Sequence, residues 1–295
     1  MLRPLVVLMC LVAPSALAQS DVKLLPVGAP AYTPELGFLI AGGGAMSWNG
    51  DPEVPTLPRS SLTLIAGGST LGAFILQGRL NTFLQNDDTR ITTGIDVRDQ
   101  PDNYFGVGFR NGFTHVLGKD TTYLRRTWWN LDPRLLKRIV GKFYVGVTLQ
   151  FSGSVGRELS PGVASDPDFA RSGASIINTG VGLTAQYDSR DVPINAWKGM
   201  LLSATWTGYA PVLGANTLFH TLSLDYRHYV TLFRRGSTLA WQVKYRTAFG
   251  DAPWSELSQV GTPFDLRAYR WGQFRDRTGF TAVLESMACA CPRWW

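Results

Sequence analysis

The sequence carries little charge and has no long apolar run beyond its N-terminus. Charged residues make up 17% of the 295 residues and hydrophobic residues 45%, which excludes a disordered chain, a coiled coil and a collagen-like array. A membrane-spanning helix needs about 20 consecutive apolar residues, and no stretch past the N-terminus approaches that length. If the chain crosses a membrane, it therefore crosses as strands, which the abundance of Phe (15), Trp (10) and Tyr (10) also favours.

Cysteine and histidine are equally scarce, with three of each. Cys289 and Cys291 are separated by one residue, too close for an easy disulfide, and they supply only two of the four ligands of a structural zinc site. We therefore expect no disulfide framework, no metal site and no cofactor. The formal net charge is +6, but the 28 Lys and Arg residues are dispersed along the chain, so nucleic acid is not an expected partner.

Residues 1–18 have the features of a cleaved secretory signal peptide. Arg3 precedes an apolar run, and Ala16-Leu17-Ala18 forms a small-residue cleavage site. The alternative is a buried first helix, which Pro14 would interrupt. We expect an exported protein with a short periplasmic segment at 19–33 and its first strand from residue 34 onward.

Alternation of apolar and polar residues dominates the rest of the chain and predicts strands. In the clearest stretch, Leu222, Leu224 and Tyr226 share one face with His220 and His228. The other face of this stretch, together with that of 237–249, carries the charged residues Asp225, Arg227, Lys244 and Arg246. The predicted strands lie at 89–98, 143–155, 177–188, 200–209, 217–231, 237–249 and 278–285.

These stretches have the length of membrane strands, and aromatic residues lie at their ends as they do in membrane strands. A transmembrane strand needs about 9 to 11 residues, whereas strands of soluble proteins have a mode near 5 to 6. Aromatic residues such as Tyr187, Trp206, Tyr226 and Phe249 tend to end the apolar face, as in interfacial girdles. Ionised groups on the opposite face suit a hydrated lumen. We predict an all-β fold, a transmembrane antiparallel β-barrel, with a soluble lipid-binding barrel as the alternative.

Two segments add a family resemblance. The first is Tyr187-Asp188-Ser189-Arg190-Asp191-Val192-Pro193, followed by Trp197-Lys198-Gly199, and the second is Gly261 to Arg277, which contains Leu266, Arg267, Tyr269, Gly272, Arg275 and Asp276. In this order, about eighty residues apart, they resemble the bacterial surface antigen family, the BamA/TamA-like outer-membrane proteins. Residues 31–38 also look like that family's first barrel strand.

The resemblance implies a barrel of sixteen strands with a long extracellular loop folded into the lumen. The loop's arginine, Arg267 here, would pair with an acidic residue of the inner wall. Ala268 stands where the family has glycine, which puts the tight backbone conformation at that position in doubt. The alternative interpretation of residues 251–277 is a solvated surface loop.

The chain also departs from the family. About eleven or twelve strands are expected in an incomplete barrel domain, 34–285, with an ambiguous stretch at 99–131 where one strand has been missed or merged. We expect no POTRA domain, because too few residues separate the predicted signal peptide from the predicted first strand. Residues 286–295 abandon the alternation, which we interpret as a frameshift or premature end that also removes the partner carboxylate of Arg267.

Catalysis is not expected. His220 and His228 lie on the apolar face of their strand, whereas Ser223 and Asp225 lie on the opposite face. Because these side chains point away from the two histidines, we expect no catalytic triad. The functional prediction is a Gram-negative outer-membrane barrel that assists the insertion or translocation of proteins or lipids through weak pairing of its terminal strands. Its expected partners are outer-membrane lipids, unfolded outer-membrane proteins and a separate periplasmic protein. The alternatives are a passive, porin-like diffusion pore and a plugged structural barrel.

Overall fold

The computed structural model describes residues 22–288, except residues 34, 52–53, 55–56, 194, 233–236 and 262–268. The signal-peptide prediction, the cysteine pair and residues Leu266 and Arg267 lie outside the described residues. No helix in the described part of the chain is long and apolar enough to span a membrane.

The structure consists mainly of long strands. The helices are short: α1 (Asn111–Thr114), α2 (Pro161–Ala164), α3 (Pro167–Ser172) and the 3-10 helices η1 (Pro211–Leu213) and η2 (Trp254–Glu256). The strands are β1 (Lys23–Thr33), β2 (Gly37–Trp48), β3 (Ser60–Ser69), β4 (Phe74–Leu84), β5 (Thr89–Asn103), β6 (Tyr123–Leu131), β7 (Arg134–Val140), β8 (Phe143–Arg157), β9 (Ser175–Asp188), β10 (Gly199–Tyr209), β11 (Phe219–Thr231), β12 (Ser237–Gly250), β13 (Ser258–Val260), β14 (Phe274–Asp276) and β15 (Thr278–Ala288).

Thirteen of these strands form one sheet with the order β1-β2-β3-β4-β5-β6-β8-β9-β10-β11-β12-β15, in which β7 pairs with β5 and β8. Strands β13 and β14 form a separate two-stranded sheet. The chain divides into two compact units, residues 1–104, 117–135 and 150–178 in the first and residues 105–116, 136–149 and 179–295 in the second.

The seven stretches predicted from the period-two pattern correspond to β5, β8, β9, β10, β11, β12 and β15, and the structure corrects several bounds. Residues 23–33, expected to precede the sheet, form β1 and pair with β2 from Lys23↔Ser47 to Thr33↔Gly37. Residues 31–38 are therefore the ends of two strands and the connection between them, not a first strand. Strand β15 continues to Ala288, three residues into the predicted aberrant tail.

The ambiguous stretch at 99–131 is also resolved. Strand β5 extends to Asn103, residues 104–109 are not in a strand, and residues 123–131 form β6. After the short break at 132–133, β7 pairs with the same two neighbours as β6, namely β5 and β8. The strand missing from the predicted count is β1 at the N-terminus, and it does not lie within 99–131.

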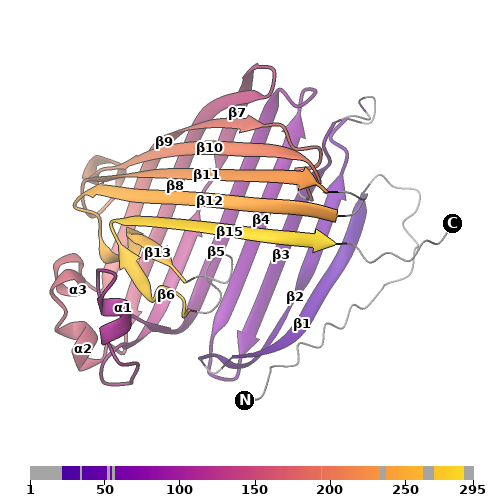
Figure 1. Ribbon diagram of the computed structural model, residues 1–295. Helices are drawn as coiled ribbons and strands as arrows, with labels where there is room; N and C mark the ends of the chain where they lie inside the picture. Colours follow the sequence, from indigo (N-terminus) through magenta and orange to yellow (C-terminus); the bar gives the residue numbers. More distant parts are fainter. Residues whose placement is uncertain are drawn as a thin grey trace. The chain divides into compact units, whose positions relative to one another are not determined.

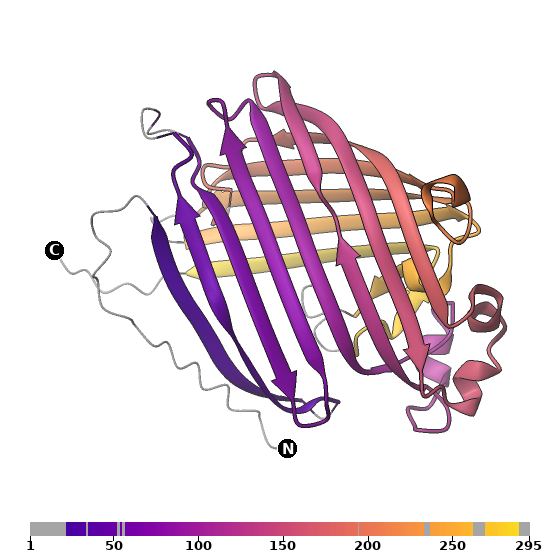
Figure 2. The ribbon, with the colours of Figure 1, turned by 180° about the vertical axis from the view of Figure 1, so that it is seen from behind.

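In the first unit, β1 to β5 lie side by side in chain order in both views (Figures 1 and 2). Leu64 is in register with Gly78, which is in register with Ile95, and both apolar side chains are exposed, at 49% and 37%. On the other face, the Gln77 Nε2 donates to Asp96 Oδ2 at 2.9 Å. The apolar face of this unit is thus the exposed one.

In the second unit, too, the apolar face is the exposed one. Its strands β10, β11, β12 and β15 lie side by side (Figure 1). Leu224 is exposed on the apolar face, as is Phe280 at 62%. On the polar face the hydroxyl groups of Thr148, Thr184 and Thr205 are linked by hydrogen bonds of 2.6 and 3.0 Å, and Thr184 is buried. A soluble sandwich would bury the opposite faces, because apolar burial stabilises it.

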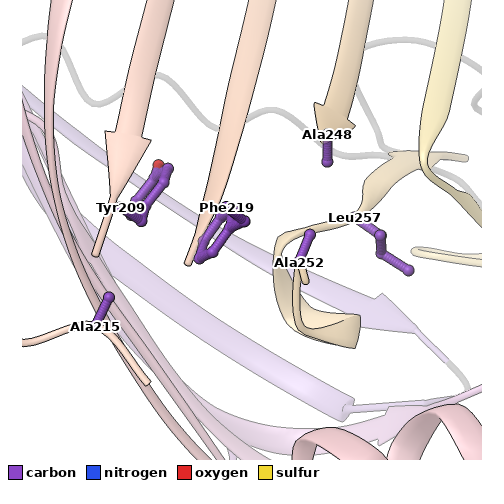
Figure 3. Packing of buried hydrophobic residues seen from close by; sticks show 6 residues of the cluster. All are labelled: Tyr209, Ala215, Phe219, Ala248, Ala252 and Leu257. Carbon is purple, nitrogen blue, oxygen red and sulfur yellow. The ribbon is translucent and has the colours of Figure 1, made fainter. Parts of the chain in front are cut away.

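A small apolar core lies where β10 and β12 end and β11 begins (Figure 3). The ring of Tyr209 stacks on Phe219 with centroids 4.2 Å apart and an interplanar angle of 6°. Ala248, Ala252 and Leu257 complete this core together with Ala215. Ala252 and Leu257 belong to the connection that follows β12, so the core anchors this connection to the ends of the strands.

Candidate functional site

The predicted charged residues share the polar face of β11 and β12. The Arg227 guanidinium donates to Asp225, with Nε 3.1 Å from each carboxylate oxygen and Nη2 2.6 Å from Oδ2. Gln242 Nε2 donates to Asp225 Oδ1 at 2.8 Å, and Lys244 lies in register with Asp225. The Asp225 carboxylate is therefore already hydrogen-bonded to side chains of β11 and β12.

Arg246, the fourth predicted charge, holds the connection that follows β12. Its guanidinium donates to the backbone carbonyl of Glu256 and lies 3.5 Å from Glu256 Oε2. The Ser258 hydroxyl donates to the Arg246 carbonyl at 2.9 Å. Trp254 in the same connection is 1% exposed. The described part of 251–277 is thus packed on the sheet, and the alternative of a merely solvated loop is wrong for it.

A third segment, far away in the sequence, completes this assembly. The N–H of Gly108 donates to the Arg275 carbonyl at 2.7 Å, and Gln273 Nε2 donates to the Gly112 carbonyl at 2.8 Å. Phe274 stacks on Phe109 with centroids 5.2 Å apart. A Cβ on Gly112 would lie 2.5 Å from the Phe274 ring, so α1 can approach β14 only because residue 112 is glycine.

The predicted loop motif is therefore placed in part. Arg275 is buried, and its guanidinium lies 4.9 Å from the Trp254 ring centroid, a cation–π contact. The ring centroids of Tyr269 and Phe274 lie 5.0 Å apart. Gly272 has a left-handed backbone conformation with a φ of +63°. Asp276 lies in β14. The expected Arg267 pin lies outside the described residues and stays a prediction.

Sequence reasoning missed several residues of this assembly. Glu256 and Trp254 follow no alternation, because they lie in a 3-10 turn whose contacts are long-range. Gly108 and Gly112 carry no local signal that would connect them to residues more than 150 positions away. Only the high aromatic content of 104–113 hinted at packing in this connection.

The turn motif between β9 and β10 is a dense hydrogen-bond network. Arg190 binds the Asp188 carboxylate in bidentate fashion: Nε lies 2.9 Å from Oδ1 and Nη2 lies 3.0 Å from Oδ2. The Arg190 Nη1 donates to the Pro193 carbonyl at 2.6 Å. Asp188 is buried, and its backbone N–H donates to the Lys142 carbonyl at 3.0 Å. A bidentate ion pair fixes the relative orientation of its two side chains, so the motif holds the ends of β9 and β10 together. Tyr187 precedes the motif on the apolar face and lies in register with Leu202.

Asp191 organises the second half of this turn. Its Oδ1 accepts the backbone N–H groups of Val192 at 2.9 Å, Trp197 at 3.0 Å and Lys198 at 3.4 Å. Burial raises the pKa of Asp191, but these N–H groups stabilise the carboxylate more, and the net pKa lies below its ordinary value. Gly199 closes the turn with a φ of +99°.

Two histidines, His220 and His228, belong to clusters of aromatic rings at two heights on the apolar face of β11. His220 stacks on Trp206 at 5.5 Å, and His228 lies 4.5 Å from Trp241 and 2.9 Å from the Tyr226 hydroxyl. The eight residues between the two levels span about 27 Å along the strand, or roughly 20 Å of height at a tilt near 40°. This is close to the apolar band of outer-membrane barrels, about 25 Å tall.

Comparison with known proteins places this fold. The barrel of BamA from Haemophilus ducreyi lacking POTRA domains 1–3 has a TM-score of 0.53 over 92% of this chain and 53% of that chain, with 11% identity. OccAB1 from Acinetobacter baumannii has a TM-score of 0.44 over 92% of this chain and 65% of that one, with 9% identity. No family model and no curated protein matches the sequence.

The chain spans about half the length of the BamA chain that it matches. Together with the all-β structure and the exposed apolar faces, the likeness shows the class of protein. The fold is that of a transmembrane antiparallel β-barrel of the bacterial outer-membrane type.

We expect Gly199→Ala to destabilise the protein far more than Gly141→Ala. Both glycines have a positive φ, +99° and +55°, so each Cβ costs roughly 1–2 kcal/mol. At Gly199 the Cβ would also lie 2.3 Å from the Ser189 carbonyl oxygen, whereas nothing lies within 4 Å at Gly141. Urea unfolding of the two variants in lipid vesicles measures the difference, and equal losses would show that the turn relaxes freely.

The Asp191 network predicts a pH dependence. A carboxyl group whose folded pKa is lowered stabilises the protein fully above its ordinary pKa of 3.8, and this contribution is lost as the pH falls through the folded value. Wild type should therefore be more stable than Asp191→Asn at pH 7, and the gap should shrink below pH 3.8. Urea titrations at several pH values test this; a gap independent of pH would contradict it.

Replacing Arg246 with Gln should release the connection that follows β12. The side chain loses both its charge-assisted bonds to Glu256, each worth about 1.5–3 kcal/mol at most, so amide exchange in 251–260 should accelerate about tenfold or more. Glu256→Gln keeps the bond to the Glu256 carbonyl and should give a smaller effect. Glu158→Gln, which removes a carboxylate from another connection, is the control. Unchanged exchange in Arg246→Gln would mean that this arginine does not hold the segment.

Proposed function

We propose that this chain is a BamA/TamA-like outer-membrane barrel that assists the insertion or translocation of proteins or lipids at the outer membrane. The likeness to the BamA barrel supports the proposal at the level of the fold. The turn at Asp188 and Arg190 and the buried Arg275 lie in the two segments that carry the sequence resemblance, and the resemblance supports the proposal alongside the fold.

The observation that carries the proposal is the composition of β1. It is a terminal strand of the sheet order, and among the described residues it pairs with β2 alone. Pro26 and Pro30 are four residues apart, so both ring nitrogens face the same edge. Because prolines of a sheet direct their nitrogens away from the paired neighbour, two hydrogen-bond donors are missing from the edge that β2 does not occupy.

An edge with missing donors pairs weakly and reversibly. Its remaining backbone groups still form a template that an incoming strand can pair with, and unsatisfied backbone groups are costly in lipid. The mechanism is therefore physical: the β1 edge exchanges the backbone hydrogen bonds of one strand partner for those of another, and no covalent bond is made or broken. A separate periplasmic protein that delivers the unfolded substrate is part of this proposal.

A passive diffusion pore is the second candidate. Arg227, Lys244 and Arg246 put three cations on the polar face of β11 and β12, against Asp225 alone on those strands. A hydrated lumen lined in this way would conduct with a mild preference for anions. The two functions predict different behaviour in the same vesicles.

The test uses proteoliposomes of the full chain and an unfolded eight-stranded barrel diluted from urea. Wild type should accelerate folding of the substrate barrel, and Pro26→Val with Pro30→Val should reduce the acceleration several-fold, because the valines restore donors and tighten the edge. Ala29→Val with Ala31→Val is the control, since it adds the same side chains to β1 where the N–H groups face β2.

The outcomes separate the two candidates. No acceleration by wild type would contradict the insertion proposal. Large, steady conductance in planar bilayers without acceleration would favour the pore, and Lys244→Glu should then weaken its anion preference.

A further inference from the structure

Charged side chains lie on the apolar face of the first unit at one end of β5, β6 and β8. Arg125 Nε donates to Asp99 Oδ1 at 2.7 Å, and Arg157 Nη2 donates to Asp99 Oδ2. Arg157 also donates to the Thr127 hydroxyl at 2.8 Å, and Arg125 to the Gly72 carbonyl at 2.6 Å. Arg125 and Arg157 are directly opposite each other in the register of β6 and β8.

The register shows that this cluster faces outward. Along the same face, Asp99 is followed by Val97 and Ile95, and Arg157 by Val155. Ile95 and Val155 are exposed, each at 37%. The polar face of the same strands carries the buried residues Arg98, Arg126, Ser152 and Ser154 instead.

The cluster also lies at the level of the lipid head groups. Phe74 is in register with Asp99 and is exposed, and Tyr32 and Phe38, paired at the same end of β1 and β2, are exposed as well. Aromatic rings mark the membrane interface of a barrel. An arginine facing lipid costs about 2–4 kcal/mol at the midplane and roughly 0–1 near the interface, so two outward arginines belong at the interface.

The loop lengths indicate which leaflet this is. Because neighbouring strands are antiparallel, connections alternate between the two ends of the sheet. The cluster lies at the end that carries the long connections 104–122 and 158–174 and the short connection 70–73. The connection between β2 and β3 lies at the other end, together with 85–88 and 141–142. Outer-membrane barrels have short periplasmic turns and longer extracellular loops. The cluster therefore faces the outer leaflet.

We infer that Arg125 and Arg157 bind a phosphate group of an outer-leaflet glycolipid. The two guanidinium groups share the single carboxylate of Asp99, whereas the neighbouring Glu158 carboxylate accepts the Tyr123 hydroxyl at 3.0 Å. Asp99 holds both of them in place, and the side chain of Arg157 remains 49% exposed. Guanidinium groups bind phosphate in bidentate fashion, and phosphates are the anions at that depth in a leaflet of phosphorylated glycolipid. The inference does not depend on whether the barrel inserts proteins or conducts.

The test measures lipid retention by native mass spectrometry on the full chain taken from vesicles. The vesicles contain bis-phosphorylated lipid A, dephosphorylated lipid A or phosphatidylglycerol. Wild type should retain bis-phosphorylated lipid A, and Arg157→Gln should reduce the retained fraction about tenfold. Arg171→Gln is the matched control, because the Arg171 side chain is 55% exposed, close to the 49% of Arg157, and pairs with one aspartate, Asp168, at 3.5 Å.

A second variant separates binding from a structural role. Asp99→Asn removes the competing negative charge but keeps an amide oxygen that can accept from the two guanidinium groups, so it should retain lipid A at least as well as wild type. It breaks the Arg157 ion pair that Arg157→Gln breaks, and the Arg125 ion pair as well. Equal retention by Arg157→Gln and Arg171→Gln would overturn the inference. Equal retention of dephosphorylated lipid A or of phosphatidylglycerol would also overturn it, since the site would then not select a phosphorylated glycolipid.

Discussion

The backbone hydrogen bonds between neighbouring strands are the constraint on which the rest of this structure depends. In lipid no water satisfies an exposed N–H or C=O group, so a membrane sheet must pair its strands continuously. Twelve strands follow one another in a single antiparallel order, with β7 continuing beside the neighbours of β6. Because the strand pairing is continuous, the side chains need not form a conventional apolar core. The residues of each face can instead match their surroundings, lipid on the apolar face and water on the polar face.

That division of faces explains where the specific contacts lie. On the apolar face, side chains are exposed and aromatic rings gather towards the strand ends. On the polar face, charged groups bind one another or hold the chain that returns to the sheet, as Arg246 does with Glu256. The connections carry the most specific geometry, because the turn at Asp188 and Arg190 must join two strands without leaving a buried group unsatisfied.

The sequence predicted the regular part of this fold well, for a physical reason. In β11 and β12 the two faces meet different solvents, so the alternation in the sequence is strong. Strand β1 was missed because Pro26 and Pro30 interrupt its pattern and nearly all of its residues are exposed. The contacts among Gly108, Glu256 and Arg275 could not be predicted, since they join segments far apart in the sequence. The turn motif was found only through its family resemblance, which says nothing of the hydrogen bonds that Asp191 accepts.

The most direct test of the account is the environment of alternate residues in one strand. Single nitroxide labels on cysteines at positions 221, 222, 223 and 224, in a background with the native cysteines replaced by serine, report collisions with oxygen and with a polar nickel complex in lipid vesicles. The account predicts that oxygen, which concentrates in lipid, relaxes the labels at 222 and 224 more than those at 221 and 223. Equal accessibility, or the opposite alternation, would contradict a barrel whose apolar face meets the membrane.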